Sequence, residues 1–344
     1  MVNSRLAGWA AARSGRTSGE PRETPLEPEQ PPSRRSVGRR ARTWLRRLGI
    51  SALAVFVAVT AFSLIFNALT KPPTLIDPGF GDYVHVGASA VHYQRWGTSG
   101  TPIVLVPGFL ESSTAWSEVG PLLGENHVVY ALDLPGAGYT RYAGPEHLPN
   151  EADLVAGFVT ALHLQRPTLV GHSLGAAVVG EVALEQPRVV GKVIFADGDG
   201  LKLSIGPRWV RSVILGSPYV TTSLRIGSRW TWADKLFIQM TCGRRCPRPS
   251  TTLARQWVRP LHQLSDEHAL HDLVLDADNG LTPAQISAIS VPAAIIWGSD
   301  DHDGGSLSDT IVNLHHPPMH IINNAGHLTM IANPQAFARA VESP

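Results

Sequence analysis

The sequence predicts an α/β protein: a mostly parallel sheet with helices on both faces, a helical cap inserted before the penultimate strand, and one N-terminal transmembrane helix. Three observations predict this. Short apolar runs alternate with helical stretches through most of residues 83–344, as in sheets covered on both faces. Between about residues 201 and 291 this rhythm gives way to amphipathic helical candidates without a clear buried strand. An uncharged apolar run lies at residues 48–69.

Residues 1–47 form an arm rich in Arg, Pro, Ser and Gly, with eleven Arg against four Glu. No apolar periodicity is present, so the arm cannot bury enough surface to offset its ordering entropy and is expected to be disordered. The whole chain has a formal net charge of +1, and the part after the arm is mildly acidic. The charge balance therefore gives no reason to expect a nucleic-acid partner.

Residues 48–69 are long enough to cross a bilayer, because 22 helical residues rise about 33 Å. The Arg cluster directly before them places the N-terminus in the cytoplasm and exports the rest of the chain. A cleaved signal peptide is the competing interpretation, but the run exceeds the usual apolar region and no small-x-small cleavage site follows. The lipid bilayer is thus an expected partner of residues 48–69.

After a linker at residues 70–82, one globular domain spans residues 83–344, with its helical cap at about residues 201–291. Helices are expected at residues 113–123, at residues 151–164 and directly after Ser173. The cap contains four tryptophans, which in amphipathic helices are more often core than substrate contacts: Trp209, Trp230, Trp232 and Trp257. Strands are expected at residues 83–86, 91–96, 102–106, 127–132, 168–170, 192–196, 292–297 and 319–322.

No cofactor and no metal are expected. The Gly136-Ala137-Gly138 loop lacks the third glycine of a dinucleotide-binding turn, because Arg141 stands at that position. The two cysteines, Cys242 and Cys246, cannot form a four-ligand zinc site alone. They could form a local disulfide in an exported protein or remain free thiols.

The turn Gly171-His172-Ser173-Leu174-Gly175 follows the apolar run at residues 168–170 and precedes a helical stretch. Glycines suit such a sharp strand-turn-helix connection, because a side chain at either flank would collide with neighbouring backbone. The turn would expose the Ser173 hydroxyl at the sheet edge. Ser173 is therefore the candidate nucleophile.

A serine needs a base held in one orientation by an acid. His327 follows the last expected strand, where Gly326 allows close backbone approach, and is the candidate base. His172 is adjacent to the nucleophile but should point away from it. The acid should follow the preceding strand, within residues 298–303.

The oxyanion formed in acyl transfer needs two N–H donors. One is expected from the backbone of Leu174, at the start of the helix after the turn. The other should come from the loop after Val106, with Phe109 the first choice and Leu110 the second. Gly108 would let this backbone approach a substrate.

In chain order, these motifs resemble those of the α/β-hydrolase family over about residues 82–342. The resemblance assigns the acid to Asp301, with Asp300 and Asp199 as alternatives, and identifies residues 201–291 as the cap of the lidded branch. Two positions depart from the family: Pro107 replaces the usual His before Gly108, and Tyr139-Thr140 replaces a small residue. The motifs are Pro107-Gly108-Phe109, Asp133–Gly138, Gly171–Gly175, Trp297–Asp301 and Gly326-His327.

The resemblance implies the serine branch, since related epoxide hydrolases and haloalkane dehalogenases need a carboxylate at position 173. We expect a membrane-anchored, extracytoplasmic serine hydrolase that cleaves a carboxylic ester of a small apolar acyl substrate through an acyl-enzyme on Ser173. Thioesterases, carbon–carbon bond hydrolases and haloperoxidase-like perhydrolases use the same residues and remain open. A catalytically silent scaffold on this fold is the alternative from another class.

Overall fold

The computed structural model describes residues 34–343 except 145–146, 203–208, 210–216, 228, 245 and 264–279. The chain divides into two compact units, residues 1–56 and 57–344. Residues 34–56 of the first unit belong to helix α1 (Arg34–Leu69), and residues 1–33 lie outside the described part. Because α1 begins at Arg34, it includes the last part of the arm that the sequence analysis expected to be disordered. Arg, Ala and Leu favour helix, so the apolar helix extends into this basic segment.

The second unit contains an eight-stranded sheet in the order β1-β2-β4-β3-β5-β6-β7-β8. Strands β1 and β2 pair antiparallel with each other and β2 pairs antiparallel with β4, whereas all remaining pairs are parallel. This confirms the predicted mostly parallel α/β fold. The strands are β1 (Asp82–Val86), β2 (Ser89–Trp96), β3 (Pro102–Val106), β4 (Val128–Leu132), β5 (Thr168–His172), β6 (Lys192–Ala196), β7 (Ala293–Gly298) and β8 (Met319–Ile322).

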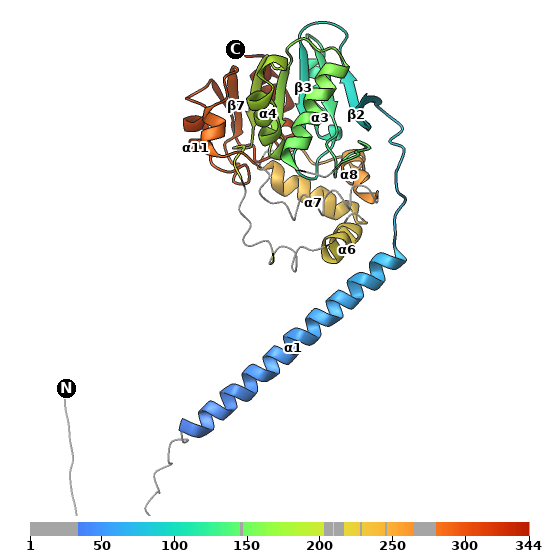
Figure 1. The fold of residues 1–344 in the computed structure, drawn as a ribbon, viewed down its shortest axis with the longest axis vertical. Helices are drawn as coiled ribbons and strands as arrows, with labels where there is room; N and C mark the ends of the chain where they lie inside the picture. Colours follow the sequence, from blue (N-terminus) through green and yellow to red (C-terminus); the bar gives the residue numbers. More distant parts are fainter. Residues whose placement is uncertain are drawn as a thin grey trace, which may run out of the picture. The chain divides into compact units, whose positions relative to one another are not determined.

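Two hydrophobic layers cover the sheet. On one face pack α3 (Leu148–Ala161) and α4 (Leu174–Glu185), which lie in front of β3 in Figure 1, together with the short α10 (Pro283–Ser287) and α11 (Leu307–Asn313). On the other face pack α2 (Val119–Leu123), α12 (Thr329–Ala332) and α13 (Pro334–Glu342). The central strands are therefore buried on both sides, which explains their continuous apolar runs.

The helix expected at residues 113–123 is divided into η1 (Ser113–Trp116) and α2. Pro121 lies in the first turn of α2, where its missing N–H is tolerated, whereas in one continuous helix it would leave the Ser117 carbonyl without its donor. Helix α3 begins at Leu148, ahead of the expected residue 151, and ends at Ala161. These differences lie at element ends, where sequence patterns are least informative.

The cap between β6 and β7 contains α6 (Ser217–Gly227), α7 (Thr231–Cys242), α8 (Thr251–Val258) and η3 (Pro260–His262). Figure 1 shows the cap helices below one end of the sheet. Of the four cap tryptophans only Trp257 is buried, at 4% exposure, whereas Trp209, Trp230 and Trp232 are exposed by 71%, 52% and 65%. The expectation that these side chains form core is wrong for three of them.

Candidate active site

Ser173 lies between β5 and α4 in a backbone conformation that few residues adopt, with φ 52° and ψ −119°. The flanking glycines make this turn possible. A Cβ on Gly171 would lie 2.1 Å from the Gly175 carbonyl oxygen, and one on Gly175 would lie 2.5 Å from the Val106 carbonyl oxygen. Both contacts are too short for any side chain. Gly171 is therefore required by the backbone of the turn itself, and Gly175 by the close approach of the end of β3.

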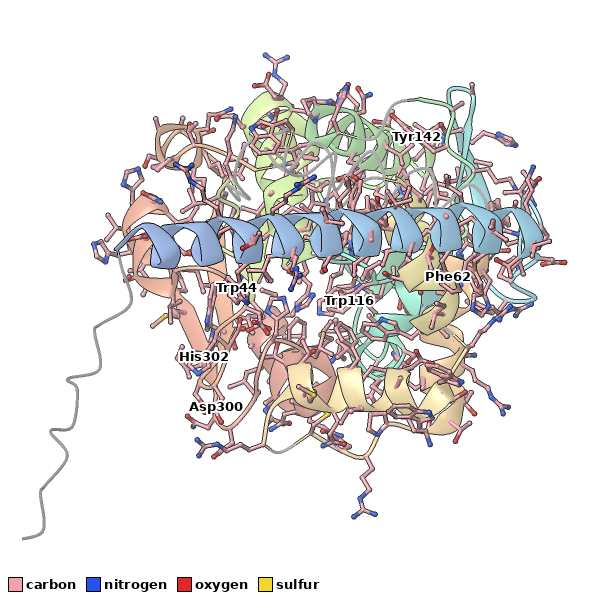
Figure 2. The ribbon with its side chains drawn as sticks, turned by 90° about the horizontal axis from the view of Figure 1, so that it is seen from below. Trp44, Phe62, Trp116, Tyr142, Asp300 and His302 are labelled. Atoms are coloured by element: carbon pink, nitrogen blue, oxygen red, sulfur yellow. A yellow bond between two sulfur atoms is a disulfide. The ribbon has the colours of Figure 1, made fainter. Side chains whose placement is uncertain are left out.

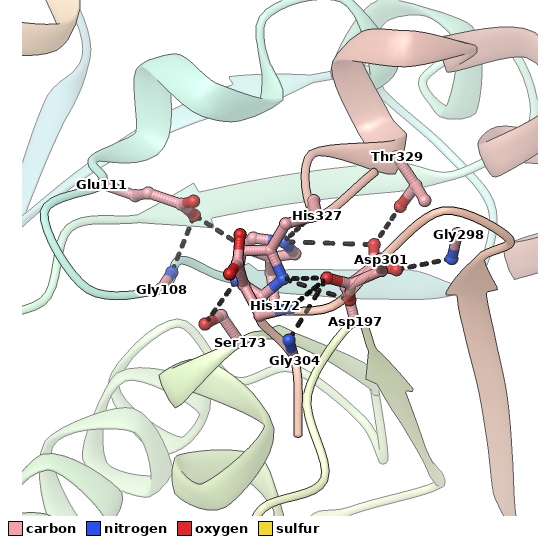
Figure 3. A network of polar contacts seen from close by, with 11 residues as sticks. Gly108, Glu111, His172, Ser173, Asp197, Gly298, Asp301, Gly304, His327 and Thr329 are labelled. Carbon is pink, nitrogen blue, oxygen red and sulfur yellow. Dashed lines mark hydrogen bonds and ion pairs between the residues drawn. The ribbon is translucent and has the colours of Figure 1, made fainter. Parts of the chain in front are cut away.

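His327 lies on the loop after β8, and its ring connects Ser173 to Asp301 (Figure 3). The His327 Nε2 atom is 2.9 Å from Ser173 Oγ, and Nδ1 is 3.1 Å from each Asp301 carboxylate oxygen. The structure thus brings together the predicted nucleophile, base and acid from the ends of three different strands.

Asp301 is held as a carboxylate. Its Oδ1 atom accepts hydrogen bonds from the backbone N–H groups of Asp303 and Gly304, at 2.8 and 3.2 Å. Burial alone would raise the pKa of Asp301, but the hydrogen bond and charge of His327, together with these N–H groups, hold it below its ordinary value. The carboxylate can therefore stabilise a positive charge that develops on His327.

The two alternative acids lie elsewhere. Asp300 forms an ion pair with Arg244 at 3.4 Å, and its side chain lies at the outer rim of the body together with His302 (Figure 2). Asp199 accepts hydrogen bonds from the backbone N–H groups of Leu201 and Ser306, at 2.9 and 3.0 Å. Within the described part of the chain, neither carboxylate contacts His327. Their interactions fix the positions of loops.

The predicted oxyanion donors face the same region. A Cβ on Gly108 would lie 2.9 Å from the Ser173 Cβ, so the loop after β3 passes directly against the nucleophile. Within the described part of the chain, the backbone N–H groups of Phe109 and Leu174 have no hydrogen-bond acceptor. Their availability fits the predicted role, and Leu110, the second choice, adopts a left-handed φ of 59°.

Sequence reasoning missed a second polar network behind His327 (Figure 3). His172 is fully buried, with Nδ1 2.9 Å from Glu111 Oε2 and Nε2 2.6 Å from the His327 carbonyl oxygen. Both partners are acceptors, and only the imidazolium form donates from both nitrogens. Glu111 also accepts from the Gly108 N–H at 2.9 Å. The sequence feature that could have indicated this network is Glu111, a charged residue that follows the apolar pair Phe109-Leu110 in the loop after β3.

The charge states of this network follow from its partners. Burial alone would lower the pKa of His172, but the charge and hydrogen bond of Glu111, aided by Asp197 and the His327 carbonyl, raise it to about 9. Burial raises the pKa of Asp197 to about 7, although His172 acts in the opposite direction. Asp197 accepts hydrogen bonds from the Gly298 N–H, at 2.7 Å, and from the Thr329 hydroxyl. It ties β6 to the loops that carry the acid and the base.

Asp133 is a structural centre for a neighbouring loop. Its carboxylate accepts from the N–H groups of Ser113 and Tyr139, at 2.6 and 2.9 Å, and lies 2.6 Å from His92 Nδ1. A Cβ on Gly138 would lie 2.3 Å from the Asp133 Cβ, which explains the glycine there. The motif that follows β4 therefore packs a turn around the Asp133 carboxylate.

The end of α7 contacts the catalytic loop. The Gly326 N–H donates to the Cys242 carbonyl and the His327 N–H to the Thr241 carbonyl, each at 2.8 Å. Cys242 and Cys246 are joined by a disulfide at this end of the helix. The cap thereby holds the backbone of Gly326 and of the predicted base, His327.

Two other features lie outside this site. A cleft of about 420 Å³ is lined by residues at the amino ends of β6 and β7, including Lys192, Pro292 and Pro318, and contains none of the predicted catalytic groups. In the described part of the chain no group of three or more His, Cys, Asp or Glu side chains is arranged to hold a metal ion.

This fold and this arrangement of serine, histidine and aspartate define a class of hydrolases. The model of the alpha/beta hydrolase family matches residues 103–340, and the chain belongs to that family. An uncharacterised hydrolase of Bacillus subtilis is 26% identical over 61% of this chain and 76% of its own length. A pimeloyl-[acyl-carrier protein] methyl ester esterase of Aeromonas hydrophila is 24% identical over 74% of this chain and 98% of its own.

Solved structures share the fold at lower identity. A membrane phospholipase A, described as a bacterial virulence factor, has a TM-score of 0.61 at 18% identity, over 89% of this chain and 97% of that one. A 2-hydroxy-6-oxo-6-phenylhexa-2,4-dienoate hydrolase of a Rhodococcus strain has a TM-score of 0.62 at 16% identity, over 76% of this chain and 96% of that one. Helix α1 contains one stretch, Arg42–Leu69, that is long and apolar enough to span a membrane.

Proposed function

We propose that the protein is a membrane-anchored serine hydrolase that cleaves a carboxylic ester through an acyl-enzyme on Ser173. The observation that carries this proposal is the continuous contact from Ser173 Oγ through His327 to Asp301. A hydroxyl, an imidazole and an ionised carboxylate in this order are the components of nucleophilic acyl transfer.

In the proposed reaction the Ser173 Oγ attacks the ester carbonyl carbon while its proton moves to His327 Nε2. Asp301 stabilises the imidazolium, and the N–H groups of Phe109 and Leu174 would stabilise the oxyanion. The tetrahedral intermediate collapses, the alcohol leaves with the proton from His327, and the acyl group remains on Ser173. Water, deprotonated by His327, then releases the carboxylic acid and restores the serine.

The ester class is supported by the apolar anchor and by the relatives. The Aeromonas relative is a methyl ester esterase and a structural neighbour is a membrane phospholipase A. A structural neighbour that is a dienoate hydrolase makes carbon–carbon bond cleavage the second candidate. Both reactions can use the same three side chains, so substrate tests decide between them.

The anchor is proposed to hold the catalytic unit outside the cytoplasm. The most apolar window of 18 residues within Arg42–Leu69 has a mean hydropathy of 2.4, and only 6% of this window is buried within the protein. The basic residues lie before this segment and at its start, ahead of the uncharged residues 48–69, which favours a cytoplasmic N-terminus. Retention in membranes after alkaline carbonate extraction, at the mass of the uncleaved chain, would support the anchor over a cleaved signal peptide.

A fluorophosphonate probe tests the nucleophile. We expect labelling of the full-length protein and no labelling of Ser173→Ala, with Ser308→Ala, another serine of the same unit, as the matched control. Turnover of p-nitrophenyl esters of graded chain length, compared with a dienoate, would separate the ester and carbon–carbon candidates. An unlabelled wild-type protein, or equal labelling of Ser173→Ala, would contradict the proposal.

A further inference from the structure

Helix α7 exposes a row of large apolar side chains on its outer face. Trp232, Leu236 and Met240 follow one another at four-residue spacing and lie on one face, with exposures of 65%, 50% and 74%. Phe237, exposed by 51%, extends this face, and Trp230 stacks on Trp232 with ring centroids 6.3 Å apart. We call these five residues the α7 apolar face.

The opposite side of α7 is already used for packing within the unit. Asp234, Ile238 and Cys242 are buried there, and the helix packs against α8. The α7 apolar face therefore does not complete the core. A contiguous exposed apolar surface of this kind marks an interaction site.

The end of α1, which belongs to the same unit, indicates what covers this face. Thr60, Ser63 and Asn67 recur on one side of α1, and Thr70 directly follows the helix. This polar stripe meets α6. Tyr219 Oη is hydrogen-bonded to Thr60 Oγ1. In membrane helices such polar side chains bind neighbouring helices and leave the apolar remainder to lipid.

Further hydrogen bonds fix the last turn of α1 to α6. Asn67 Nδ2 donates to the Pro218 carbonyl at 2.9 Å, and the buried Arg225 donates to the Asn67 carbonyl at 2.6 Å. The guanidinium of Arg229 lies 5.6 Å from the centre of the Phe66 ring. Arg229 directly precedes Trp230, so the α7 apolar face starts one residue from a contact with the apolar helix.

The length of α1 places these contacts at the membrane surface. The 28 residues Arg42–Leu69 extend about 42 Å, close to a bilayer with its headgroup layers and longer than the hydrocarbon core of about 30 Å. The last turn of α1 and the α6 residues bound to it then lie at headgroup level, whereas the contact of Thr60 with Tyr219 lies about 13 Å deeper in the leaflet. Trp is the residue enriched at headgroup level, where its ring is apolar and its N–H remains hydrated.

We propose that the α7 apolar face inserts into the outer leaflet of the bilayer that α1 spans, so that the cap is a membrane-docking surface. This inference rests on the proposed membrane anchor. Because the last carbonyls of α7 bind the backbone of Gly326 and His327, docking would hold the catalytic loop against a surface that supplies lipid-dissolved esters.

The test uses the full-length protein in dioleoylphosphatidylcholine vesicles that contain nitroxide-labelled phosphatidylcholine. Met240→Cys is labelled with an environment-sensitive fluorophore, and the two native cysteines are protected by their disulfide. Val312→Cys on α11 is the matched control, because Val312 is also apolar and 60% exposed. We expect lipid nitroxide to quench the Met240 label at least about threefold more strongly than the Val312 label.

Other outcomes distinguish the two proposals. Protein that resists carbonate extraction but carries an unquenched Met240 label would overturn docking while leaving the anchor intact. Equal quenching of both labels would also overturn it. A Met240 label shielded from aqueous iodide yet untouched by lipid nitroxide would mean that protein, such as a second copy, covers the face. Complete extraction by carbonate would remove the anchor itself, and docking with it.

A kinetic experiment adds an independent readout. The double variant Trp232→Ser, Met240→Ser should lose about tenfold in turnover of a long-chain ester embedded in vesicles, because two large apolar side chains no longer enter the bilayer. Its turnover of water-soluble p-nitrophenyl acetate should be unchanged. Unchanged turnover on both substrates would overturn the proposal.

Discussion

Two histidine–carboxylate pairs lie side by side next to Ser173, and the centroids of the His172 and His327 rings are 4.9 Å apart. In the pair His327–Asp301 one ring nitrogen contacts a hydroxyl that can lose its proton, and the histidine side chain is 11% exposed. In the pair His172–Glu111 both ring nitrogens contact acceptors and the histidine is fully buried. An imidazole and a carboxylate therefore form the proposed proton carrier in one place and a fixed positive clamp, His172 with Glu111, in the other. The difference lies in the partner of the second nitrogen.

The largest expected effect separates the two histidines. His327→Gln should lower kcat by about 10⁴-fold or more, because no base then accepts the Ser173 proton. His172→Gln should retain most of this activity, with a loss of about tenfold, since only the position of the His327 backbone is disturbed. Kinetics with a p-nitrophenyl ester on both variants, after circular dichroism shows that each is folded, would test this. Equal losses would contradict the proposed division of roles.

The next effect separates the carboxylates. Asp301→Asn should lower kcat by about 10²–10⁴-fold, because the amide cannot stabilise the His327 imidazolium. Asp300→Asn, a neighbouring change on the same loop, should leave kcat within about twofold, because Asp300 contacts Arg244 rather than His327. A greater loss from Asp300→Asn than from Asp301→Asn would reverse the assignment of the acid.

A smaller effect is expected from Glu111→Gln. Without the carboxylate, His172 loses the charge that keeps it protonated, and a neutral ring can donate to only one of its two partners. We expect kcat to fall about tenfold with little change in KM, because the Gly108 and His327 backbone positions shift while the acyl-binding surface remains. The measurement is the separate determination of kcat and KM. A loss confined to KM would instead place Glu111 at the substrate.

The smallest effect is on stability and its dependence on pH. The folded-state pKa of His172, about 9, exceeds its ordinary value of 6.5, so this stabilisation is full below pH 6.5 and is lost as pH rises through 9. The pKa of Asp197 is raised from 3.8 to about 7. Between pH 3.8 and 7 the unfolded chain therefore loses this proton more readily than the folded protein, and the free energy of unfolding falls. Both raised pKa values make the folded protein less stable as the pH rises. The free energy of unfolding should fall by about 1–3 kcal/mol between pH 6 and pH 9.5.

Denaturant titrations across this range measure the slope, and His172→Gln is the matched variant. That variant should lose most of the decline between pH 7 and 9.5, whereas the decline below pH 7 should remain. A stability that is flat with pH in the wild-type protein would show that the two buried groups do not titrate as their surroundings indicate.

Much of the fold was predictable because buried parallel strands read as short apolar runs, and the predicted acid, base and nucleophile follow strand ends. The clamp of His172 and Glu111 was not predictable, since the sequence analysis expected only that His172 would point away from Ser173. Its partner comes from a loop 61 positions earlier in the chain, and no local pattern joins them. The start of α1 was also misplaced, because charged residues do not end a helix.

The cap tryptophans show what helical periodicity cannot predict about burial. Apolar residues at four-residue spacing predict one buried stripe on a helix, but the pattern does not say whether protein or another apolar medium buries it. On α7 the stripe of Trp232, Leu236 and Met240 is exposed, and the buried side contains Asp234, Ile238 and Cys242. Tertiary contacts, which periodicity does not contain, decide which side is covered.

The backbone of Ser173 carries a further consequence. A non-glycine residue at φ 52° and ψ −119° is held there against its own preference, at a cost of about 1–3 kcal/mol. Glycine adopts this conformation freely, so Ser173→Gly should yield a protein that melts at a higher temperature and hydrolyses nothing. The proposed nucleophile is thus held in a turn whose thermodynamic preference is for the residue that cannot react.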